Sequence, residues 1–344
     1  MDLWDYLKTT DKPVALYGTG NGADKIINKM QLDGTACKIA GVFASSGFVR
    51  NKQFRGYQIE SYEAVKARLG DMIVLMCFGT NRPEVLSNVY RIASENEFYA
   101  PDVPVYGSTM FDTAFYEANR ESIEWVKAHL ADDLSRVTMD DTVAYKLSGD
   151  VRYLRNSEVS ADEADGLFSL PSDSVFVDLG AYNGDTVLRY TSLFPSISTI
   201  HAVEPDARNF RKLGENTSSL SVNYYNALIS DHVGTALMAR NKGRGNSETA
   251  AGEIEVPAIT VDSILGGGRA DFIKFDVEGN ESKAIAGAAS TIARWSPQML
   301  MSCYHRSEDI FALAQQVLAI NPSYKVYMRH LPYVPCWDTA FYFV

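Results

Sequence analysis

The sequence predicts an α/β protein with two Rossmann-like units in tandem, of which the second is the larger. Short apolar runs typical of buried strands alternate with segments of helical spacing along most of the chain. A strand, a glycine turn and a helical segment follow one another in each half, at residues 13–30 and again at residues 175–190. The length of 344 residues is more than one core needs and is sufficient for two domains.

The first unit covers residues 1–110. Its glycine turn, Gly-x-Gly-x-Gly at residues 18–22, follows a strand at residues 13–17 and precedes a helix at residues 23–30. We predict further strands at residues 39–44, 72–78 and 103–106, and helices at residues 62–69 and 83–95. This alternation is typical of a parallel sheet.

This first glycine turn raises the alternative of a nicotinamide-dependent oxidoreductase. The strand at residues 39–44 ends in Ala44-Ser-Ser, however, and not in the acid that would bind the ribose of such a cofactor. A non-catalytic module that senses a nucleotide-like ligand is a second alternative.

A helical linker is expected at residues 111–165. The apolar residues Phe115, Ile123, Trp125, Val126 and Leu130 follow helical spacing with charges between them, so these helices should bridge the two units. The acidic stretch at residues 156–165 is predicted to be a surface connection.

The second unit begins with the most informative segment of the chain. An apolar strand ends in Asp178 and turns through Gly180 and Gly184, and the next strand ends in Glu204-Pro205. This order places a glycine turn beneath an adenosine and a carboxylate at its ribose hydroxyls. The turn is Gly-x-x-x-Gly and lacks the spacing of a pyrophosphate site. The sequence therefore predicts S-adenosylmethionine, with Asp178 facing its ammonium group.

A third acid-tipped strand, at residues 271–275, is followed by Asp276 and Glu278. Ligands of open α/β sheets bind at the carboxyl ends of the strands, so the three acidic ends should meet in one cleft.

These segments together carry a resemblance to a known family. Residues 165–344 resemble the FkbM-type family of S-adenosylmethionine-dependent methyltransferases, through residues 178–186, 203–205, 256–262 and 273–279. The resemblance implies a class I methyltransferase fold over residues 166–344, with a mostly parallel sheet and a reversed last strand. It also implies O-methylation of a hydroxyl on a small metabolite, sugar or glycan precursor.

The predicted cofactor site extends over three strand ends. Glycines 180 and 184 allow close backbone approach, Glu204 should bind both ribose hydroxyls, and the end of the strand at residues 222–229 should meet adenine. The predicted cofactor-binding residues are Asp178, Gly180, Ala181, Tyr182, Asn183, Gly184, Glu204, Pro205, Asn226 and Ala227.

Catalysis is assigned to His305, Asp276 and Glu278. His305 follows a strand at residues 297–303 and should act as general base, because imidazole titrates near neutrality. Asp276 should position the acceptor, while Glu278 touches substrate or braces a loop. The alternatives are a core or surface histidine and an acid pair at a helix start.

The other polar residues of the second unit do not indicate a catalytic or metal-binding role. Asp262 suits a helix N-cap, and no cluster has metal-ligand spacing. Asp276 with Glu278 would suit a hard cation, but we expect no required metal.

Composition narrows the partners. The formal net charge is −11 and the largest basic cluster near the cleft is residues 240–244, so no nucleic acid is expected.

No apolar run approaches the length of a membrane helix, and the start of the chain lacks the features of a secretion signal. Three of four scattered cysteines should be buried free thiols. We expect a cytoplasmic enzyme with a carbohydrate-like small-molecule substrate and a glycine-rich mobile loop at residues 243–252. A monomer and a homo-oligomer are both open alternatives.

Overall fold

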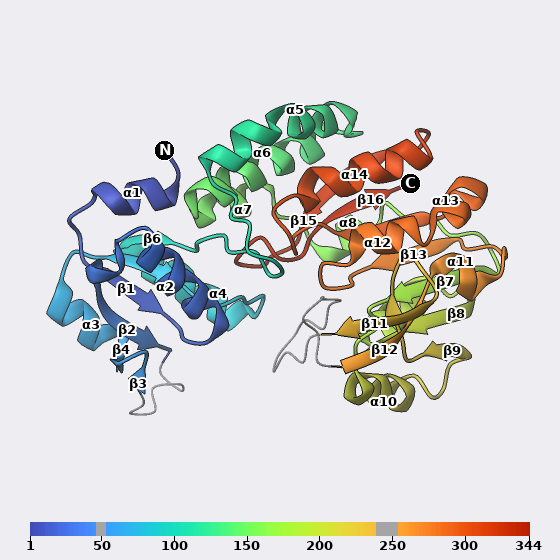
Figure 1. Ribbon diagram of the computed structural model, residues 1–344, viewed down its shortest axis with the longest axis horizontal. Coiled ribbons are helices and arrows are strands. Elements are labelled where there is room, and N and C mark those ends of the chain that lie inside the picture. Colours follow the sequence, from blue (N-terminus) through green and yellow to red (C-terminus); the bar gives the residue numbers. More distant parts are fainter. Residues whose placement is uncertain (46–52, 239–253) are drawn as a thin grey trace.

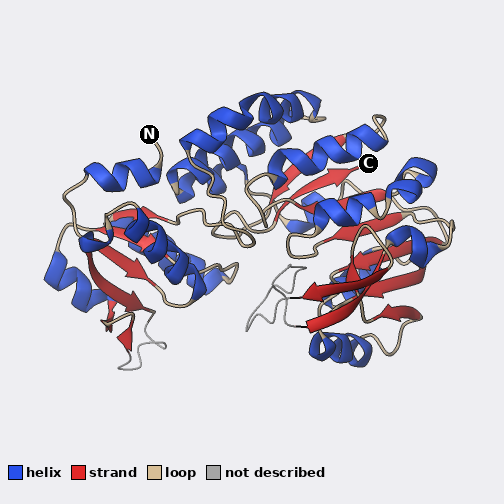
Figure 2. Ribbon diagram, viewed as in Figure 1, coloured by secondary structure: helices blue, strands red, loops and turns tan. Residues whose placement is uncertain are grey.

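The structure is a computed structural model that describes residues 1–45, 53–238 and 254–344. The predicted glycine-rich loop at residues 243–252 and the basic cluster at residues 240–244 lie outside these ranges. Two α/β units stand side by side and a group of helices joins them (Figure 1). Helices cover the strands of both units (Figure 2).

The N-terminal unit is a six-stranded sheet with the strand order β3-β4-β2-β1-β5-β6. All neighbours run parallel except β3 with β4. Its strands are β1 (Val14–Tyr17), β2 (Ile39–Ala44), β3 (Gln53–Phe54), β4 (Tyr57–Ser61), β5 (Ile73–Met76) and β6 (Glu97–Tyr99). Its helices are α1 (Leu3–Thr9), α2 (Asn21–Leu32), the short 3-10 helix η1 (Ala36–Lys38), α3 (Tyr62–Leu69) and α4 (Pro83–Glu95).

The helices predicted at residues 62–69 and 83–95 are confirmed with their bounds. The strand predicted at residues 103–106 is wrong. This stretch has no regular structure, and the sixth strand is β6, directly after α4. Pro101 and Pro104 have no backbone N–H to donate, so this segment cannot form the regular hydrogen bonds of a central strand.

Four helices link the units: α5 (Thr113–His129), α6 (Asp133–Ser148), α7 (Val151–Ser157) and α8 (Ala161–Asp165). Each begins after a residue whose side chain accepts a hydrogen bond from the first turn, namely Asp112, Asp132, Asp150 and Ser160. The prediction of a surface connection at residues 156–165 is wrong in part. Asp165 is buried and accepts a 2.8 Å hydrogen bond from the Tyr190 hydroxyl.

The C-terminal unit contains a seven-stranded sheet with the order β15-β16-β14-β13-β7-β8-β9. The last strand, β16, runs antiparallel to both of its neighbours, and the strands from β14 to β9 are parallel. The predicted mostly parallel sheet with a reversed last strand is therefore confirmed. The strands are β7 (Ser174–Leu179), β8 (Ile197–Val203), β9 (Val222–Tyr225), β13 (Phe272–Phe275), β14 (Gln298–Ser302), β15 (Val326–His330) and β16 (Thr339–Phe343).

The third strand of this sheet is shorter than predicted. It ends at Tyr225, and β10 (Leu228–Ile229) belongs to a separate sheet with β11 (Gly234–Met238) and β12 (Ile254–Ile259). The helices of this unit are α9 (Asp185–Leu193), α10 (Ala207–Asn216), α11 (Val261–Leu265), α12 (Glu281–Ala286), α13 (Ala289–Trp295) and α14 (Asp309–Ile320).

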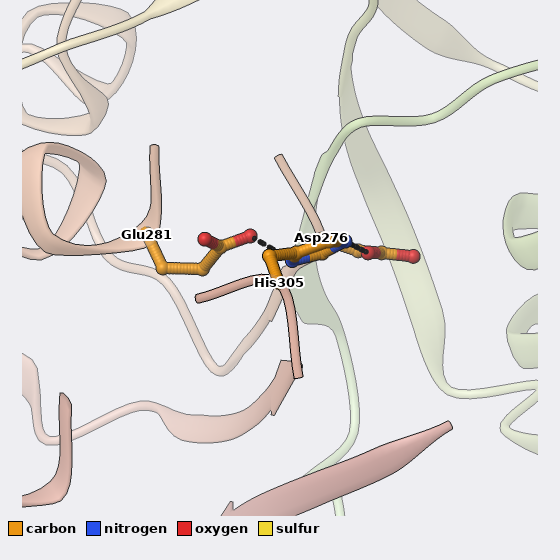
Figure 3. A group of neighbouring side chains, drawn as sticks. All are labelled: Asp276, Glu281 and His305. Carbon is orange, nitrogen blue, oxygen red and sulfur yellow. Dashed lines mark ion pairs between the residues drawn. The ribbon is translucent and has the colours of Figure 1, made fainter. Parts of the chain in front are cut away.

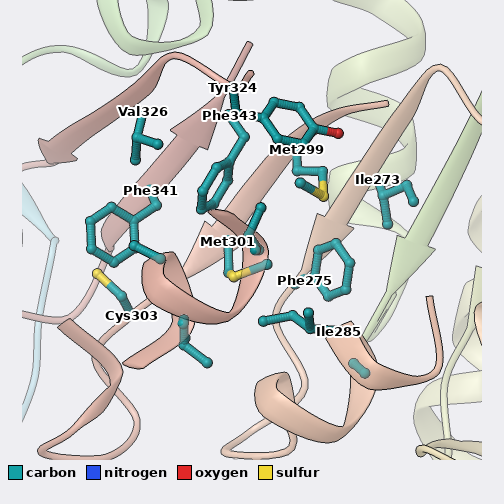
Figure 4. Close-up of a cluster of buried hydrophobic side chains, with 14 of the residues drawn as sticks. Ile273, Phe275, Ile285, Met299, Met301, Cys303, Tyr324, Val326, Phe341 and Phe343 are labelled. Carbon is teal, nitrogen blue, oxygen red and sulfur yellow. The ribbon is translucent and has the colours of Figure 1, made fainter. Parts of the chain in front are cut away.

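The main core lies between the C-terminal sheet and its helices. Figure 4 shows Phe275, Met301 and Phe341 side by side from three neighbouring strands, with Ile285 of α12 facing them. Cys77, Cys303 and Cys336 are buried free thiols, as predicted, and Cys37 is exposed. Within the described ranges no helix is long and apolar enough to cross a membrane.

The division into residues 1–110, 111–165 and 166–344 stays our proposal for the domain organisation. The strands of the first sheet end at Tyr99, the linking helices begin at Thr113, and the second sheet begins at Ser174.

The turn after β7 depends on glycine at position 180. Gly180 has a φ of +81°, and a Cβ atom there would overlap the backbone carbonyl oxygen of Asp276. Gly184 has a φ of +89°, and its Cβ would lie 2.7 Å from the Thr217 methyl carbon. Gly180 therefore lets the ends of β7 and β13 meet closely, and Gly184 lets the turn pack against the end of α10.

We predict that Gly180→Ala lowers the free energy of unfolding by at least about 2 kcal/mol, because it adds a left-handed alanine and a backbone overlap. Gly214→Ala is the matched control, since a Cβ at this position of α10 meets open space. Thermal unfolding should show a clear fall in melting temperature for the first variant and almost none for the second. Equal melting temperatures for both variants would contradict the packing described here.

Candidate functional site

A cavity of about 1100 Å³ opens at the carboxyl ends of β7, β8, β13 and β14. The three acid-tipped strands predicted from the sequence therefore do end around one space. The predicted site residues that line it are Gly180, Tyr182, Glu204, Pro205, Ala227, Asp276 and Glu278.

Glu204 is the fixed acid on one side of this cavity. Its side chain is buried, and its two oxygens accept backbone hydrogen bonds from Tyr182 N–H at 3.0 Å and from Asp206 N–H at 2.8 Å. Burial raises the pKa of Glu204 to about 7. The carboxylate is thus held in one orientation at the place where a ribose is expected.

The neighbouring predicted residues support this acid from behind. Asn226 donates a 2.8 Å hydrogen bond to the backbone oxygen of Glu204, so it braces the loop that carries this acid. Ala181 is fully buried, and the backbone oxygen of Asn183 accepts a hydrogen bond from Asn216.

Lys274 is the site residue that sequence reasoning missed. It stands opposite Asp178 in the pairing of β13 with β7, and its ammonium lies 3.3 Å from Asp178 Oδ1 and 3.6 Å from Asp276 Oδ2. It also donates a hydrogen bond to the Gly180 carbonyl at 3.1 Å. A lysine in the apolar strand Phe-Ile-Lys-Phe was the available signal, because a buried lysine needs carboxylate partners.

These contacts correct the role expected of Asp178. The residue is fully buried, and the cation that it faces is Lys274, which itself lines the cavity. Burial raises the pKa of Asp178, although Lys274 opposes that shift. Burial alone would lower the pKa of Lys274, but Asp178 and Asp276 raise it above its ordinary value.

His305 lies among three carboxylates. Its Nδ1 is 2.9 Å from Glu281 Oε1, and its Nε2 is 3.5 Å from Asp276 Oδ1 and 3.5 Å from Glu278 Oε2. Figure 3 shows Glu281 and Asp276 turned toward the imidazole from opposite sides. The sequence therefore brought His305, Asp276 and Glu278 together correctly, but it did not reveal Glu281.

The titration expected of His305 is wrong. Burial disfavours the imidazolium, but Glu281, Glu278 and Asp276 outweigh burial and raise the pKa of His305 to about 10. A histidine that is 1% exposed and already protonated at neutral pH is poorly suited to accept a proton. This argues against the general base that we expected.

The two acids on the cavity wall differ from each other. Desolvation works against ionisation of Asp276, but Lys274 and His305 lower its pKa below the ordinary value. Burial raises the pKa of Glu278. Glu278 also has a left-handed backbone with a φ of 55°, a conformation that persists only where the surrounding structure enforces it.

The lining of the cavity also includes residues that no sequence motif indicated. Tyr304 donates a 3.4 Å hydrogen bond to Asp276, and Tyr333 and Asp338 come from the connection between β15 and β16. Asn81 of the N-terminal unit lines the same cavity. Both units therefore contribute side chains to the same cavity.

The N-terminal glycine turn is used for packing. Thr80 and Val334 exchange backbone hydrogen bonds of 2.8 and 3.0 Å, and the Trp337 ring lies against Gly79. Pro335 and Trp337 line a cavity of about 240 Å³ beside Gly22. Because the C-terminal unit covers this edge of the first sheet, the nicotinamide alternative is disfavoured.

Asp262 does not cap the helix that it was expected to begin. Thr260 is the N-cap of α11, and Asp262 instead accepts hydrogen bonds from the backbone of Ser290 and Thr291 in α13.

Comparison with known proteins finds a matching family profile in the second half of the chain. Residues 178–326 match the family profile of the methyltransferase FkbM domain. A crystal structure of Methyltransferase FkbM from Methylobacillus flagellatus KT shares 19% identity, with 99% of this chain and 92% of that chain covered and a TM-score of 0.72. The fold of both units is therefore shared with that protein.

More distant structures align with about half of the chain. Fibrillarin from Aeropyrum pernix, in complex with natively bound S-adenosyl-L-methionine, shares 17% identity over 53% of this chain and 72% of its own, with a TM-score of 0.35. A search of curated proteins finds no match.

We predict that affinity for S-adenosylhomocysteine increases about ten-fold between pH 6 and pH 8. The free protein holds Glu204 with a pKa of about 7, so most of it is protonated at pH 6 and ionised at pH 8. Ribose hydroxyls donate to the ionised form, so binding strengthens as pH rises. Calorimetric titration at both pH values measures this.

Glu204→Gln is the control for this pH dependence. The variant should bind more weakly at pH 8 and should lose the pH dependence that the carboxylate causes. An unchanged pH profile in this variant would remove Glu204 from the ribose role.

Proposed function

We propose that this chain, whose residues 178–326 form a methyltransferase FkbM domain, methylates a hydroxyl group of a small metabolite, sugar or glycan precursor. The protein is a methyltransferase and S-adenosylmethionine is its cofactor. The observation that carries the proposal is one cavity with the fixed carboxylate of Glu204 on one side and the acid pair Asp276 and Glu278 on another.

The residues on the Glu204 side fit the cofactor. Glu204 presents a buried carboxylate whose orientation is set by two backbone N–H groups, which suits two ribose hydroxyls. Gly180 lines the cavity at the end of β7, where the absence of a side chain lets its backbone lie close to the Asp276 carbonyl. Ala227 lines the cavity beyond Glu204, where adenine is expected. When bound, the cofactor supplies an electrophilic sulfonium methyl group.

The residues on the other side suit a hydroxylated acceptor. Asp276 and Glu278 are each about one-third exposed at their side chains and offer acceptor oxygens. Tyr304, Tyr333 and Asn81 add rings and polar groups on the same wall. Hydroxyl groups donate to such acceptors, and aromatic rings cover the apolar faces of a sugar.

The charge of the chain supports the same substrate class. A formal net charge of −11 disfavours a polyphosphate substrate such as a nucleic acid.

The hydroxyl proton must leave as the acceptor oxygen gains a methyl group. We assign this proton to Glu278, because burial raises the pKa of its carboxyl group and makes it the stronger proton acceptor of the two acids. Asp276, with a lowered pKa, stays ionised and orients the hydroxyl. His305 is a positioning residue that holds both carboxylates from behind.

The binding half of the proposal is tested by calorimetric titration with S-adenosylmethionine and S-adenosylhomocysteine. We expect one site per chain and a thermal shift with either ligand. Absence of heat and of a thermal shift at millimolar ligand would end the proposal.

The catalytic half predicts that Glu278→Gln lowers turnover by at least about 10²-fold, the usual cost of removing a general base. The readout is formation of S-adenosylhomocysteine with a panel of sugars and other hydroxylated acceptors. Affinity for S-adenosylhomocysteine should stay within about two-fold, because β7 lies between the strands whose ends carry Glu278 and Glu204. Glu124→Gln, an exposed acid on α5, is the matched control with unchanged turnover.

Two outcomes would contradict this assignment. Full turnover in Glu278→Gln would leave alignment of the substrates as the catalytic device. Cofactor binding by the wild-type protein without turnover on any acceptor would favour a non-catalytic binding module.

A further inference from the structure

The group around His305 has an excess of acid. Asp276, Glu278 and Glu281 all approach one imidazole, with ring nitrogen to oxygen distances of 2.9–3.5 Å. Packing this many carboxyl groups together is costly unless a cation compensates them.

Some of the polar atoms in this group lack hydrogen bonds. Among the described residues, Glu281 Oε2 and both ring nitrogens of His305 are buried and have no hydrogen-bond partner, although the ring nitrogens face carboxylates as ion pairs. Glu281 and His305 are each 1% exposed. Buried polar atoms without partners in a native protein call for a ligand or an ion.

The spacing of these atoms suits a metal ion. One ligand atom each from Asp276, Glu281 and His305 lie within 4.8 Å of one another. Ligand atoms bound at about 2.1 Å to one ion lie about 3 to 4.2 Å apart, so the three side chains must move closer together and His305 must bind the ion through one ring nitrogen.

We propose that Asp276, Glu281 and His305 bind one divalent transition-metal ion at the carboxyl ends of β13 and β14, against the acceptor side of the cavity. This reverses our expectation from the sequence, which found no cluster with metal-ligand spacing because Glu281 was not part of it. Two carboxylates and an imidazole suit Mn²⁺ or Zn²⁺, whereas Mg²⁺ prefers oxygen ligands alone.

Asp276 connects the proposed metal site with the cavity, because its carboxylate contacts His305 and also lines the cavity. An ion held there lowers the pKa of a bound hydroxyl and leaves Glu278 beside it to take the proton. This catalytic consequence rests on the proposed function. The metal site does not, since metal binding is measured without an acceptor or a cofactor.

The test is titration of chelator-treated protein with Mn²⁺, followed by the electron paramagnetic resonance signal of the free ion. We expect one Mn²⁺ per chain, bound at least about ten-fold more tightly than Mg²⁺ in competition, because of the imidazole ligand. Glu281→Gln and Asp276→Asn should each weaken Mn²⁺ binding at least about ten-fold. Asp185→Asn is the matched control, since it makes the same change in an exposed acid of the same cavity, outside the cluster.

Folding of each variant is checked through its affinity for S-adenosylhomocysteine and its melting temperature. Both ligand variants are close in shape to the native side chains, so at least one folded variant is expected. The proposal is overturned if the wild-type protein binds neither Mn²⁺ nor Zn²⁺ below about 1 mM, a free energy of only about 4 kcal/mol. It is also overturned if Asp185→Asn weakens Mn²⁺ binding as much as Glu281→Gln does.

Failure of the metal site and failure of the proposed function are distinguishable. Cofactor binding without Mn²⁺ binding removes the metal alone. Mn²⁺ binding without cofactor binding keeps the metal site and ends the proposed function.

Discussion

The buried ammonium of Lys274 is the interaction on which the functional end of the C-terminal sheet depends. Its strand, β13, lies between β7 and β14, and the side chain contacts Asp178 of the neighbouring strand and Asp276 beyond its own strand end. A charge at this depth requires carboxylate partners, and each carboxylate requires the lysine. The pairing therefore fixes the two central strand ends relative to each other, and it keeps Asp276 ionised where the cavity begins.

The N-terminal unit also supports the cavity of the C-terminal unit. The residues after β5 pack against the connection between β15 and β16. Thr80 exchanges backbone hydrogen bonds with Val334, and the Trp337 ring lies against Gly79. That connection carries Tyr333 and Asp338 to the cavity wall, and Asn81 joins them from the first unit. The end of a sheet that binds nucleotides in many α/β proteins here packs against residues that line another unit's cavity.

The sequence predicted those parts of the structure that local chemistry decides. The helix at residues 83–95 begins with proline in its first turn, and the helix at residues 62–69 follows the capping residue Ser61, so both were predicted with correct bounds. The strand predicted at residues 103–106 does not form. Its hydrophobic pattern is typical of a strand, but Pro104 within it and Pro101 before it lack the backbone N–H that a sheet needs.

The chemistry of the site was less predictable, because it depends on contacts between distant residues. His305 was placed at the correct strand end, but its titration is set by Glu281, which lies in another helix. Asp178 was recognised as important from the motif, yet its partner is a lysine of a different strand. Sequence patterns locate such residues, and only the fold shows which charge each of them meets.

The segment that joins the units also supports the acid-bearing turn. Tyr106 donates its backbone N–H to the oxygen of His305 at 2.9 Å, and a Cβ at Gly279 would lie 2.9 Å from the Tyr106 side chain. Arg306 stacks on the Tyr106 ring and donates to the Gly279 oxygen at 2.8 Å. These contacts hold the turn from both sides, and Glu278 keeps its left-handed backbone within it. The strain at the acid pair is thus maintained by a residue from outside the C-terminal unit, so the two units need each other to form one site.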